Sequence, residues 1–487
     1  MDLTFRPARR FALTKRSNLA RLRAALELAE RSFGALGLYV ATPKDKEMAG
    51  WERRLIVGFL LAFACLLEAP GLLAASSPGP ANSILPDPIP PGTTITMQNW
   101  QRYRQYMPDG MAALFQGSYF WKMPPDVQMP VGPTIIHPLP PGYLAATEKY
   151  SGQVGISQLS DGGLTITGYK GGIPFPAPAE PHKGWKVLAD LWFRYTPHIT
   201  VNTRGVVCFN DSSHLVSCKA GMKIYRQLSF NTDPGTPVTY PGAEGKYFTQ
   251  FEMVEEPEQE RYTAVLTISP ADLTQHEEVY LFLPSLRRYQ PLSPAARCSQ
   301  DVGTDETPDD RRYGFDANPT KLEVDYIGEK QILTLMPDKM PAGRFPLNYD
   351  MPLGWPEPSW GKWQVRKVHE ISVSRLPALS AGYCYAKRVV YVDAAMYAPL
   401  WEDLYDTQMQ FKRSIGLFLH TLNVPGIGPQ DSSNSLVEAI WDVQTKHATI
   451  FAEPGDDQPF YINEQVPQRY TDVNRYTTPS GLNLIMR

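Results

Sequence analysis

Eight histidines and one acidic run are the side chains best suited to catalysis or metal binding in this chain of 487 residues. The histidines are scattered, and none lies four residues from another. The sequence has no GxSxG elbow, HExxH pair, phosphate-binding P-loop or GxGxxG turn. His369, in "KVHEISV", has no recognisable nucleophile beside it, which favours a structural or surface role. We therefore expect a protein that is not an enzyme and has no cofactor.

The acidic side chains gather in the segment "SQDVGTDETPDDRRYGFDANP". Calcium binds oxygen-rich loops, but this spacing fits no EF-hand-type loop. We therefore expect no metal site here, and a solvated loop that Arg311 and Arg312 partly neutralise. The acidic residues are Asp301, Asp305, Glu306, Asp309, Asp310 and Asp316.

Four cysteines in the main body of the chain are candidates for disulfide bonds. Cys208 and Cys218 flank "FNDSSHLVS", a predicted hairpin loop, which favours a bond between them and leaves Cys298 to pair with Cys384. Four cysteines allow three pairings, so sequence alone leaves the connectivity open. The spacing does not indicate a zinc site.

The segment "WERRLIVGFLLAFACLLEAPGLLAASS" is typical of a secretory signal peptide. Arg53 and Arg54 precede an apolar run over residues 55–67, which is short for a membrane span. Small residues around Ala75 suit cleavage. We therefore expect residues 51–75 to be a signal peptide; an uncleaved anchor is the alternative, and both place the body outside the cytoplasm.

The signal-like segment divides the chain into predicted regions. Residues 1–50 form an N-terminal extension, and Met48 is a candidate for the true translation start. A lipoprotein box ending at Cys65 is a further alternative, but apolar residues continue beyond it, which favours a soluble mature form. A Pro-rich linker over 76–91 precedes the main domain, 92–487.

Composition and charge exclude some classes of protein. Apolar residues make up 43% of the chain, which is typical of a globular protein rather than a disordered one. Residues 1–75 hold 12 Lys and Arg against 7 Asp and Glu, whereas the remainder holds 35 against 43. A mildly acidic main body argues against nucleic-acid binding.

Periodicity predicts few helices followed by many strands. "TMQNWQRYRQYM" and "GMAALFQG" have helical patterns, and the pattern is clearest in "HKGWKVLADLWFRY", which we expect to end at Thr196. Alternating segments follow, among them "YTAVLTIS", "EVYLFLPSLRRY", "KLEVDY" and "GKWQVRKVHEISVSRL". Serial strands joined by turns predict an antiparallel meander, either a sandwich or a barrel.

The segment "CYAKRVVYVDAAMYAPLWEDLYD" predicts two strands joined by a turn. Its first strand is apolar on both faces, with Val390 and Val392 on one and Val389 and Tyr391 on the other. A surface hairpin of an antiparallel sheet commonly has one face exposed to water. Because this strand is apolar on both faces, both must be covered. The second cover is either packed protein or a bound hydrophobic molecule.

Several segments resemble the exported proteobacterial family called domain of unknown function 1329, over roughly residues 92–487. They are "GGIPFPAPAEPHKGWKVLADLWFRY", "VYLFLPSLRRYQPLSPAARC", "FDANPTKLEVDYIGEKQIL", "YAKRVVYVDAAMYAPLWEDLYD" and the closing "YTTPSGLNLIMR". That family is similar in fold to the lipoprotein carriers LolA and LolB. The resemblance implies a mainly β (α+β) fold, a strongly curved antiparallel sheet that forms an unclosed barrel with plug or lid helices.

The resemblance also implies a function. It indicates a non-catalytic periplasmic carrier or chaperone for a lipid, a lipoprotein or another hydrophobic compound. The expected partners are an RND-type inner-membrane exporter and an outer-membrane protein, and association with the outer membrane is an alternative to a soluble periplasmic form. A structural or regulatory subunit of an envelope transport complex is the second hypothesis. An envelope-lipid hydrolase is the third, disfavoured because no nucleophile motif is present.

Candidate ligand-binding residues follow from the apolar elements and the implied fold. The parity of each strand decides which of its faces looks inward, and an error of one residue reverses the assignment. The candidates are, for the lid helix, Trp185, Leu188, Trp192 and Tyr195, and, for the cavity wall, Tyr280, Phe282, Val390, Val392 and Trp401.

Overall fold

The computed structural model divides the chain into two compact units, 1–81 and 82–487, and every residue that it describes lies in the second. The predicted N-terminal extension, signal peptide and most of the linker therefore fall outside the described residues. Within the described part, no helix is both long and apolar enough to cross a membrane. The described residues are 87–293, 297–300, 303–337, 345–452 and 460–486.

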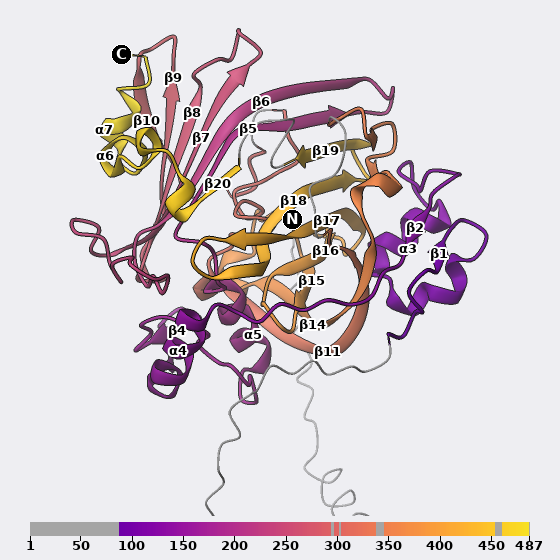
Figure 1. The fold of residues 1–487 in the computed structure, drawn as a ribbon, viewed down its shortest axis with the longest axis horizontal. Helices are drawn as coiled ribbons and strands as arrows, with labels where there is room; N and C mark the ends of the chain where they lie inside the picture. Colours follow the sequence, from indigo (N-terminus) through magenta and orange to yellow (C-terminus); the bar gives the residue numbers. More distant parts are fainter. Residues whose placement is uncertain (1–86, 294–296, 301–302, 338–344, 453–459, 487) are drawn as a thin grey trace, which may run out of the picture. The chain divides into compact units, whose positions relative to one another are not determined.

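One antiparallel sheet of fourteen strands organises the second unit (Figure 1). In the runs β5 to β10 and β14 to β19 each strand pairs with the next, so the predicted meander is confirmed. β19 pairs with β5 and joins the two runs, while β20 adds to β5. The strands are β5 (Ile199–Asn210), β6 (Val216–Gln227), β7 (Lys246–Glu256), β8 (Ala264–Pro270), β9 (Glu278–Leu283), β10 (Arg288–Leu292), β11 (Leu322–Leu335), β14 (Trp363–Arg375), β15 (Lys387–Asp393), β16 (Pro399–Tyr405), β17 (Phe411–Val424), β18 (Gly428–Asp442), β19 (His447–Ala452) and β20 (Phe460–Ile462).

The sheet is unclosed. Its edge strands β10 and β11 follow each other in the chain but stand at opposite ends of the strand order. Because successive side chains point to opposite faces, the sheet has an inner face, which carries Val207, Val265 and Val390, and an outer face, which carries Leu266 and Trp401. The mainly β, open-sheet architecture expected from the sequence is confirmed.

Short helices and strand pairs surround this sheet. The helix predicted around "TMQNWQRYRQYM" is a 3-10 helix, and the one predicted at "GMAALFQG" is α3. The helices are α3 (Asp109–Gln116), α4 (Pro141–Tyr150), α5 (Lys183–Trp192), α6 (Val473–Tyr476) and α7 (Pro479–Leu482), with 3-10 turns η2 (Trp100–Tyr106), η3 (Ser151–Gln153), η4 (Pro319–Lys321), η5 (Pro358–Trp360), η6 (Pro377–Leu379), η7 (Asn463–Gln465) and η8 (Gln468–Tyr470). The small strands pair as β1 (Thr94–Ile95) with β2 (Met129–Pro130), β3 (Gly155–Gln158) with β4 (Leu164–Thr167), and β12 (Tyr349–Asp350) with β13 (Trp355–Pro356).

The N-terminal part of the unit covers the outer face of β14 to β19. Trp401 stacks on Trp441 with ring centroids 5.8 Å apart, inside a large aromatic cluster. Helix α3 approaches this face closely at Gly110, whose backbone N–H donates to Asp403 Oδ2 at 3.0 Å. A Cβ at Gly110 would lie 2.1 Å from Ser414 Oγ, so the close approach requires glycine.

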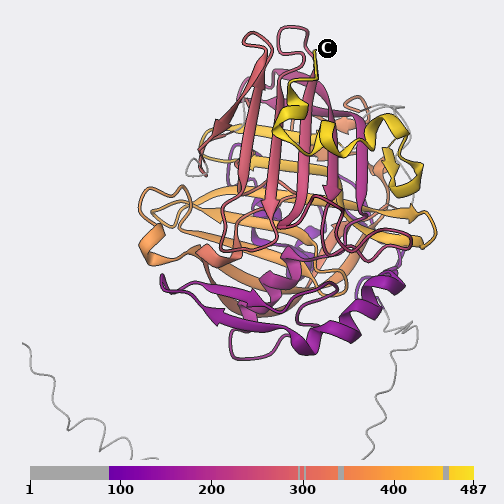
Figure 2. The same ribbon diagram turned by 90° about the vertical axis from the view of Figure 1, so that its left-hand side faces the viewer.

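The C-terminal segment covers the outer face of β6 to β9, where helices α6 and α7, in yellow, cross the strands (Figure 2). Leu482 is fully buried there. Tyr476 meets the ring of Phe251 edge-on, with centroids 5.2 Å apart. The two halves of the sheet thus bury their outer faces against opposite ends of the described chain.

Helix α5 fills part of the inner face. Its side chains Leu188 and Leu191 pack with Val390 and Val392, both fully buried, so the second cover of this strand is packed protein. The helix ends at Trp192, four residues before the predicted end. The chain then enters β5 at Ile199.

The acidic segment also packs on the inner face, and the prediction of a solvated loop there is wrong. Asp309 and Asp310 are fully buried, and Asp305, Arg312 and Asp316 are nearly so. Asp305, Asp309 and Asp310 are accommodated because they meet arginines of the sheet and Arg297. Buried charges require such partners. The ion pairs are Arg297–Asp309, Arg375–Asp309, Arg388–Asp310 and Arg413–Asp305.

Candidate functional site: an apolar cleft and an adjoining polar pocket

A cleft of about 610 Å³ lies on the inner face of β5 to β9, the half of that face that α5 does not fill. Strand pairing aligns its apolar side chains across neighbouring strands, and many of them are only half buried. Apolar surface left open in a concave site is the usual lining of a small-molecule pocket. The apolar lining on this face includes Val207, Val254, Val265, Val279, Leu281, Leu283 and Phe451.

Two glycines help to form this cleft. Gly205 and Gly221 are directly opposite each other on β5 and β6, and both line the cleft. A Cβ at Gly221 would lie 2.5 Å from the backbone oxygen of Met253, so a side chain is excluded there. The absence of two neighbouring side chains leaves room between the apolar residues of adjacent strands.

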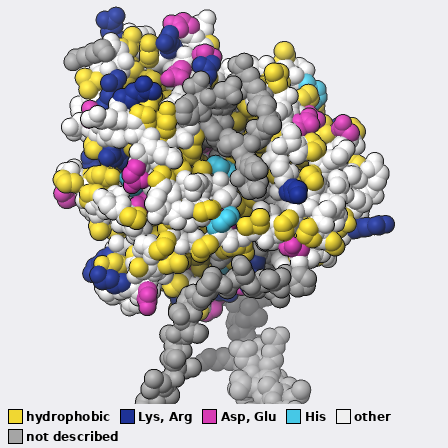
Figure 3. All heavy atoms as spheres, viewed as in Figure 1, with side chains coloured by type: hydrophobic (Ala, Val, Ile, Leu, Met, Phe, Trp, Pro, Cys, Tyr) yellow, Lys and Arg dark blue, Asp and Glu magenta, His cyan; other side chains and the backbone are white. Residues whose placement is uncertain are grey.

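Two ion pairs line the cleft. Lys219 Nζ lies 2.6 Å from Glu260 Oε2, and Lys223 Nζ lies 3.6 Å from Glu252 Oε1. Paired charges leave the cleft without a strong field of one sign. On the face of the molecule seen in Figure 3, acidic and basic side chains are likewise interspersed.

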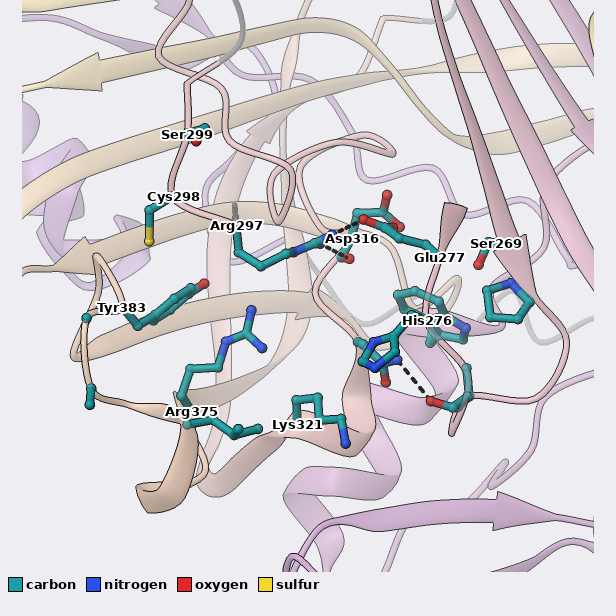
Figure 4. A pocket seen from close by; sticks show the side chains of 17 residues that line it. Ser269, His276, Glu277, Arg297, Cys298, Ser299, Asp316, Lys321, Arg375 and Tyr383 are labelled. Atoms are coloured by element: carbon teal, nitrogen blue, oxygen red, sulfur yellow. Dashed lines mark hydrogen bonds and ion pairs between the residues drawn. The ribbon is translucent and has the colours of Figure 1, made fainter. Parts of the chain in front are cut away.

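A second cavity of about 490 Å³ adjoins the cleft, and most of its lining residues are polar or charged, so we call it the polar pocket (Figure 4). Glu277, Arg297 and Ser299 line both cavities. The Arg297 guanidinium pairs with Glu277, donates to Asp309 Oδ1 at 2.6 Å and donates to the backbone oxygen of Asp316 at 3.1 Å. Arg297 therefore stands at the junction of the cleft with the polar pocket.

Asp309 lies beneath this pocket and is held as a carboxylate. Arg375 Nη2 donates to its Oδ2 at 2.7 Å, and the Tyr383 hydroxyl donates to the same oxygen. Burial alone would raise the pKa of Asp309, but Arg297 and Arg375 outweigh it and lower the pKa to about 2. The disulfide Cys298–Cys384 fastens the Arg297 segment beside Tyr383, and a second disulfide joins Cys208 to Cys218.

Asp316 differs from the other carboxyl groups of the pocket. Its side chain is buried, lines the pocket, and has no hydrogen-bond partner for either oxygen among the described residues. Burial, and then repulsion by Glu277, raise the pKa of Asp316 to about 8. Trp192 also lines the pocket, and within the described ranges its indole N–H has no acceptor. The pocket thus contains one acceptor group and one donor that a ligand could satisfy.

The polar pocket also contains side chains of the types that take part in catalysis. They are His276 and the hydroxyls of Ser269 and Ser299, and no hydrogen bond joins this histidine to either serine among the described contacts. In the described ranges, no three His, Cys, Asp or Glu side chains are placed to hold a metal ion. His369 lies on β14, where its Nδ1 is 3.1 Å from the Tyr326 hydroxyl.

The structure does not gather the sequence-predicted ligand residues at the cleft. Trp192 lines the polar pocket, and Tyr195 lies beyond the end of α5 beside a small internal cavity. The helix residues Trp185 and Leu188 are buried, and the Trp185 indole donates to the backbone oxygen of Pro319 at 3.1 Å. For these residues to act as a lid, α5 would have to separate from the neighbours against which it packs.

The predicted wall residues lie elsewhere for reasons of strand parity. Tyr280 and Phe282 point to the outer face, where they pack with the C-terminal helices. Trp401 is also on the outer face, and Val390 and Val392 contact α5. None of the nine predicted residues lines the cleft. Their role in ligand binding stays a prediction, and it requires α5 or the outer covers to move.

Sequence reasoning missed the residues that do line the cleft, although signals were present. β9 is apolar at five successive positions, so its pattern favours Val279, Leu281 and Leu283 as ligand-binding residues as much as Tyr280 and Phe282. In β8, Val265 interrupts an otherwise polar face, which is a weak sign of a binding surface. For Val207 and Val254 the sequence has no comparable signal, because only strand pairing brings them together.

Comparison with known proteins places the chain in a family. No curated protein matches significantly. A solved DUF1329 family protein from Desulfovibrio piger is 11% identical, with a TM-score of 0.42, and the match covers 62% of this chain and 98% of that one. A domain from Vibrio parahaemolyticus, provisionally described as outer membrane lipoprotein-sorting, is 13% identical, with a TM-score of 0.41 and coverages of 61% and 99%. A LolA superfamily protein from Nitrosomonas europaea is 10% identical, with a TM-score of 0.32 and coverages of 57% and 92%. Residues 94–483 match the family described as "Protein of unknown function (DUF1329)", and the chain belongs to this family.

Proposed function

We propose that this protein is a non-catalytic carrier that holds a hydrophobic ligand, such as a lipid or an acyl chain, in the cleft of β5 to β9. One observation carries the proposal: α5 fills one half of the inner face, while over the other half apolar side chains of the sheet, together with part of the acidic segment, surround about 610 Å³ of space. Burying this surface under a ligand is favourable by roughly 25 cal/mol per Å². A partly open apolar concavity of this kind marks a binding site.

The proposed setting is the periplasm. The signal-like pattern of residues 51–75 supports export, and two disulfides suit an oxidising compartment. In this setting a carrier would take its ligand at the inner membrane, with an RND-type exporter as the proposed partner, and release it to an outer-membrane protein. Neither partner is needed for the ligand-binding test below.

The first experiment asks whether the cleft holds a ligand. Native mass spectrometry and organic extraction of protein purified from its own host would identify a co-purifying hydrophobe, which we expect. We also expect the naphthylamine probe N-phenyl-1-naphthylamine to bind the ligand-free protein, because its fluorescence rises in an apolar site. An apo mass with no probe uptake would contradict the carrier proposal and favour a structural subunit of an envelope complex.

A matched pair of variants locates the site. Leu281→Asp places a carboxylate in the cleft, and we expect it to weaken probe binding at least tenfold, about 1.4 kcal/mol. The control is Leu286→Asp, the same change at an exposed position in the turn between β9 and β10. Equal affinities in the two variants would show that the probe binds outside the cleft.

A further inference from the structure

We infer that the polar pocket binds the head group of the same ligand, and that this head carries a primary ammonium that donates hydrogen bonds to the carboxylate of Asp316. The inference rests on the proposed function, since it assigns the ligand's tail to the cleft. It goes further by naming a class of ligand, amphiphiles with a primary amine, and the residue that selects them.

The first support is that the two cavities adjoin. Glu277, Arg297 and Ser299 line both, so a molecule with its hydrocarbon tail on β5 to β9 can extend its polar end past Arg297. The cleft is apolar with paired charges, whereas the pocket is surrounded by charged and hydrogen-bonding groups (Figure 4). This change of polarity along one path matches an amphiphile.

The second support is the balance of charge around the pocket. Arg297 is paired with Glu277 and Asp309, Arg375 is paired with Asp309, and Lys321 lies 3.0 Å from Asp161. Each cation that lines the pocket thus has a carboxylate partner. Asp316 is the lining carboxyl for which no ion pair or side-chain hydrogen bond is found among the described residues.

Two further arginines act on the charge of Asp316 without lining the pocket. Arg312 donates to the backbone oxygen of Trp192 at 2.8 Å and lies over the ring of Phe248. Arg311 donates to the Thr267 hydroxyl at 3.4 Å. Neither guanidinium hydrogen-bonds to Asp316 among the described contacts, so both oxygens of this buried carboxyl group keep their capacity to accept a hydrogen bond from a ligand.

The third support is the chemistry of a buried, unpartnered carboxyl group. Leaving such a group unsatisfied costs free energy, and it is relieved by a donor or by protonation. Burial raises the pKa of Asp316 to about 8, so in the empty pocket the group is mostly protonated at pH 7. A primary ammonium offers three N–H donors and a compensating charge, and its binding would expel this proton. The Trp192 indole N–H can then donate to an oxygen of the same head group.

The test uses two lipids that differ only at the ammonium. Palmitoyl lysophosphatidylethanolamine has three N–H donors, and palmitoyl lysophosphatidylcholine has the same tail, phosphate and charge with none. Each lipid is added, below its critical micelle concentration, to full-length protein loaded with N-phenyl-1-naphthylamine, and the displacement of this probe measures the affinity of the lipid. We expect the ethanolamine lipid to bind at least tenfold more tightly. At pH 7, calorimetry in two buffers of different ionisation heat should show close to one proton released with this lipid.

Asp316→Asn keeps the shape of the side chain and removes its charge. We expect this variant to prefer the ethanolamine lipid over the choline lipid by less than about twofold, and to release no proton on binding. Asp325→Asn, the same change at an exposed position of β11, should leave both unchanged. Equal affinities of the two lipids for the unmodified protein would overturn the inference while probe binding still upheld the carrier. Failure of the probe itself to bind would overturn both.

Discussion

At the scale of single residues, Asp309 is the clearest case of a charge that the fold both buries and uses. It is fully buried, yet its pKa is lowered to about 2, because Arg297, Arg375 and Tyr383 all contact it. These three residues come from segments on either side of the polar pocket (Figure 4). Asp309 therefore connects the walls of the pocket electrostatically.

We predict that Asp309→Asn lowers the free energy of unfolding by about 3–5 kcal/mol at pH 7, because it removes the buried carboxylate that pairs with both Arg297 and Arg375. The folded-state pKa lies below the usual value of 3.8. Ionised Asp309 thus stabilises the fold above about pH 4, and this contribution is lost as the pH falls towards 2. Urea unfolding at pH 7, 4 and 3 should show the difference narrowing.

The control for this prediction is Asp325→Asn, which should stay within about 0.5 kcal/mol of the unmodified protein, as exposed substitutions do. A difference for Asp309→Asn that is constant from pH 7 to pH 3 would contradict an electrostatic origin. It would indicate instead that the substitution acts through packing.

The burial of this acidic segment could not be predicted from the sequence for a physical reason. Arg311 and Arg312 lie next to the acids in the chain, so local reasoning pairs them. Arg297, 12 residues from Asp309, is one partner, while Arg375, Arg388 and Arg413 are 66 or more residues away from the acids and reach them only once the sheet has formed. Patterns within a short window contain no information on such pairs.

At the scale of elements, α5 is held against the backbone of an edge strand. A Cβ at Gly184 would lie 2.8 Å from the backbone nitrogen of Tyr326 and 2.8 Å from the backbone oxygen of Val324. Any residue other than glycine at position 184 would therefore prevent α5 from approaching β11 so closely. This contact also covers part of a strand edge that has no further strand partner in the described sheet.

We predict that Gly184→Ala destabilises the protein by about 1–3 kcal/mol, because overpacking against β11 outweighs the helix propensity of alanine. Thermal unfolding would measure the change. Gly328→Ala is the control, since a Cβ on this residue of β11 meets nothing within 4 Å. Stabilisation by Gly184→Ala would show that α5 can shift away from the strand, as a movable lid requires.

The elements themselves were largely predictable, whereas the faces that they present were not. The helix around Trp185 and the strand pair from Lys387 to Tyr405 follow from periodicity. In β9 and β15, however, both faces are apolar, so the pattern cannot say which one meets the core. The elements that cover each face decide which side chains are buried against which neighbours: Phe282 packs against the C-terminal helices, and Val390 packs against α5.

At the scale of the whole molecule, two disulfides constrain very different lengths of chain. Cys208–Cys218 spans 10 residues, while Cys298–Cys384 spans 86 and ties the Arg297 segment to the start of β15. Loop-closure entropy predicts a stabilisation of about 2.7 kcal/mol for the first and about 4.6 kcal/mol for the second. The second bond also fixes one side of the polar pocket.

We therefore compare two double variants, Cys298→Ala with Cys384→Ala and Cys208→Ala with Cys218→Ala. We predict that the first lowers the free energy of unfolding by about 2 kcal/mol more than the second. Guanidinium unfolding of the two double variants measures this difference. Loss of the preference for the ethanolamine lipid in the first variant alone is expected as well. Equal losses of stability would show that loop closure does not govern the contribution of these bonds.

The cover of β6 to β9 by the last described residues has a consequence for how the chain acquires its structure. Phe251, Leu266 and Phe282 can be shielded from water only when Tyr476 and Leu482 have been synthesised, some 190 residues or more after the strands they cover. This half of the sheet therefore depends on contacts between residues that are far apart in the chain. Non-local contacts of this kind make folding slow, because the long intervening loop must close before they can form.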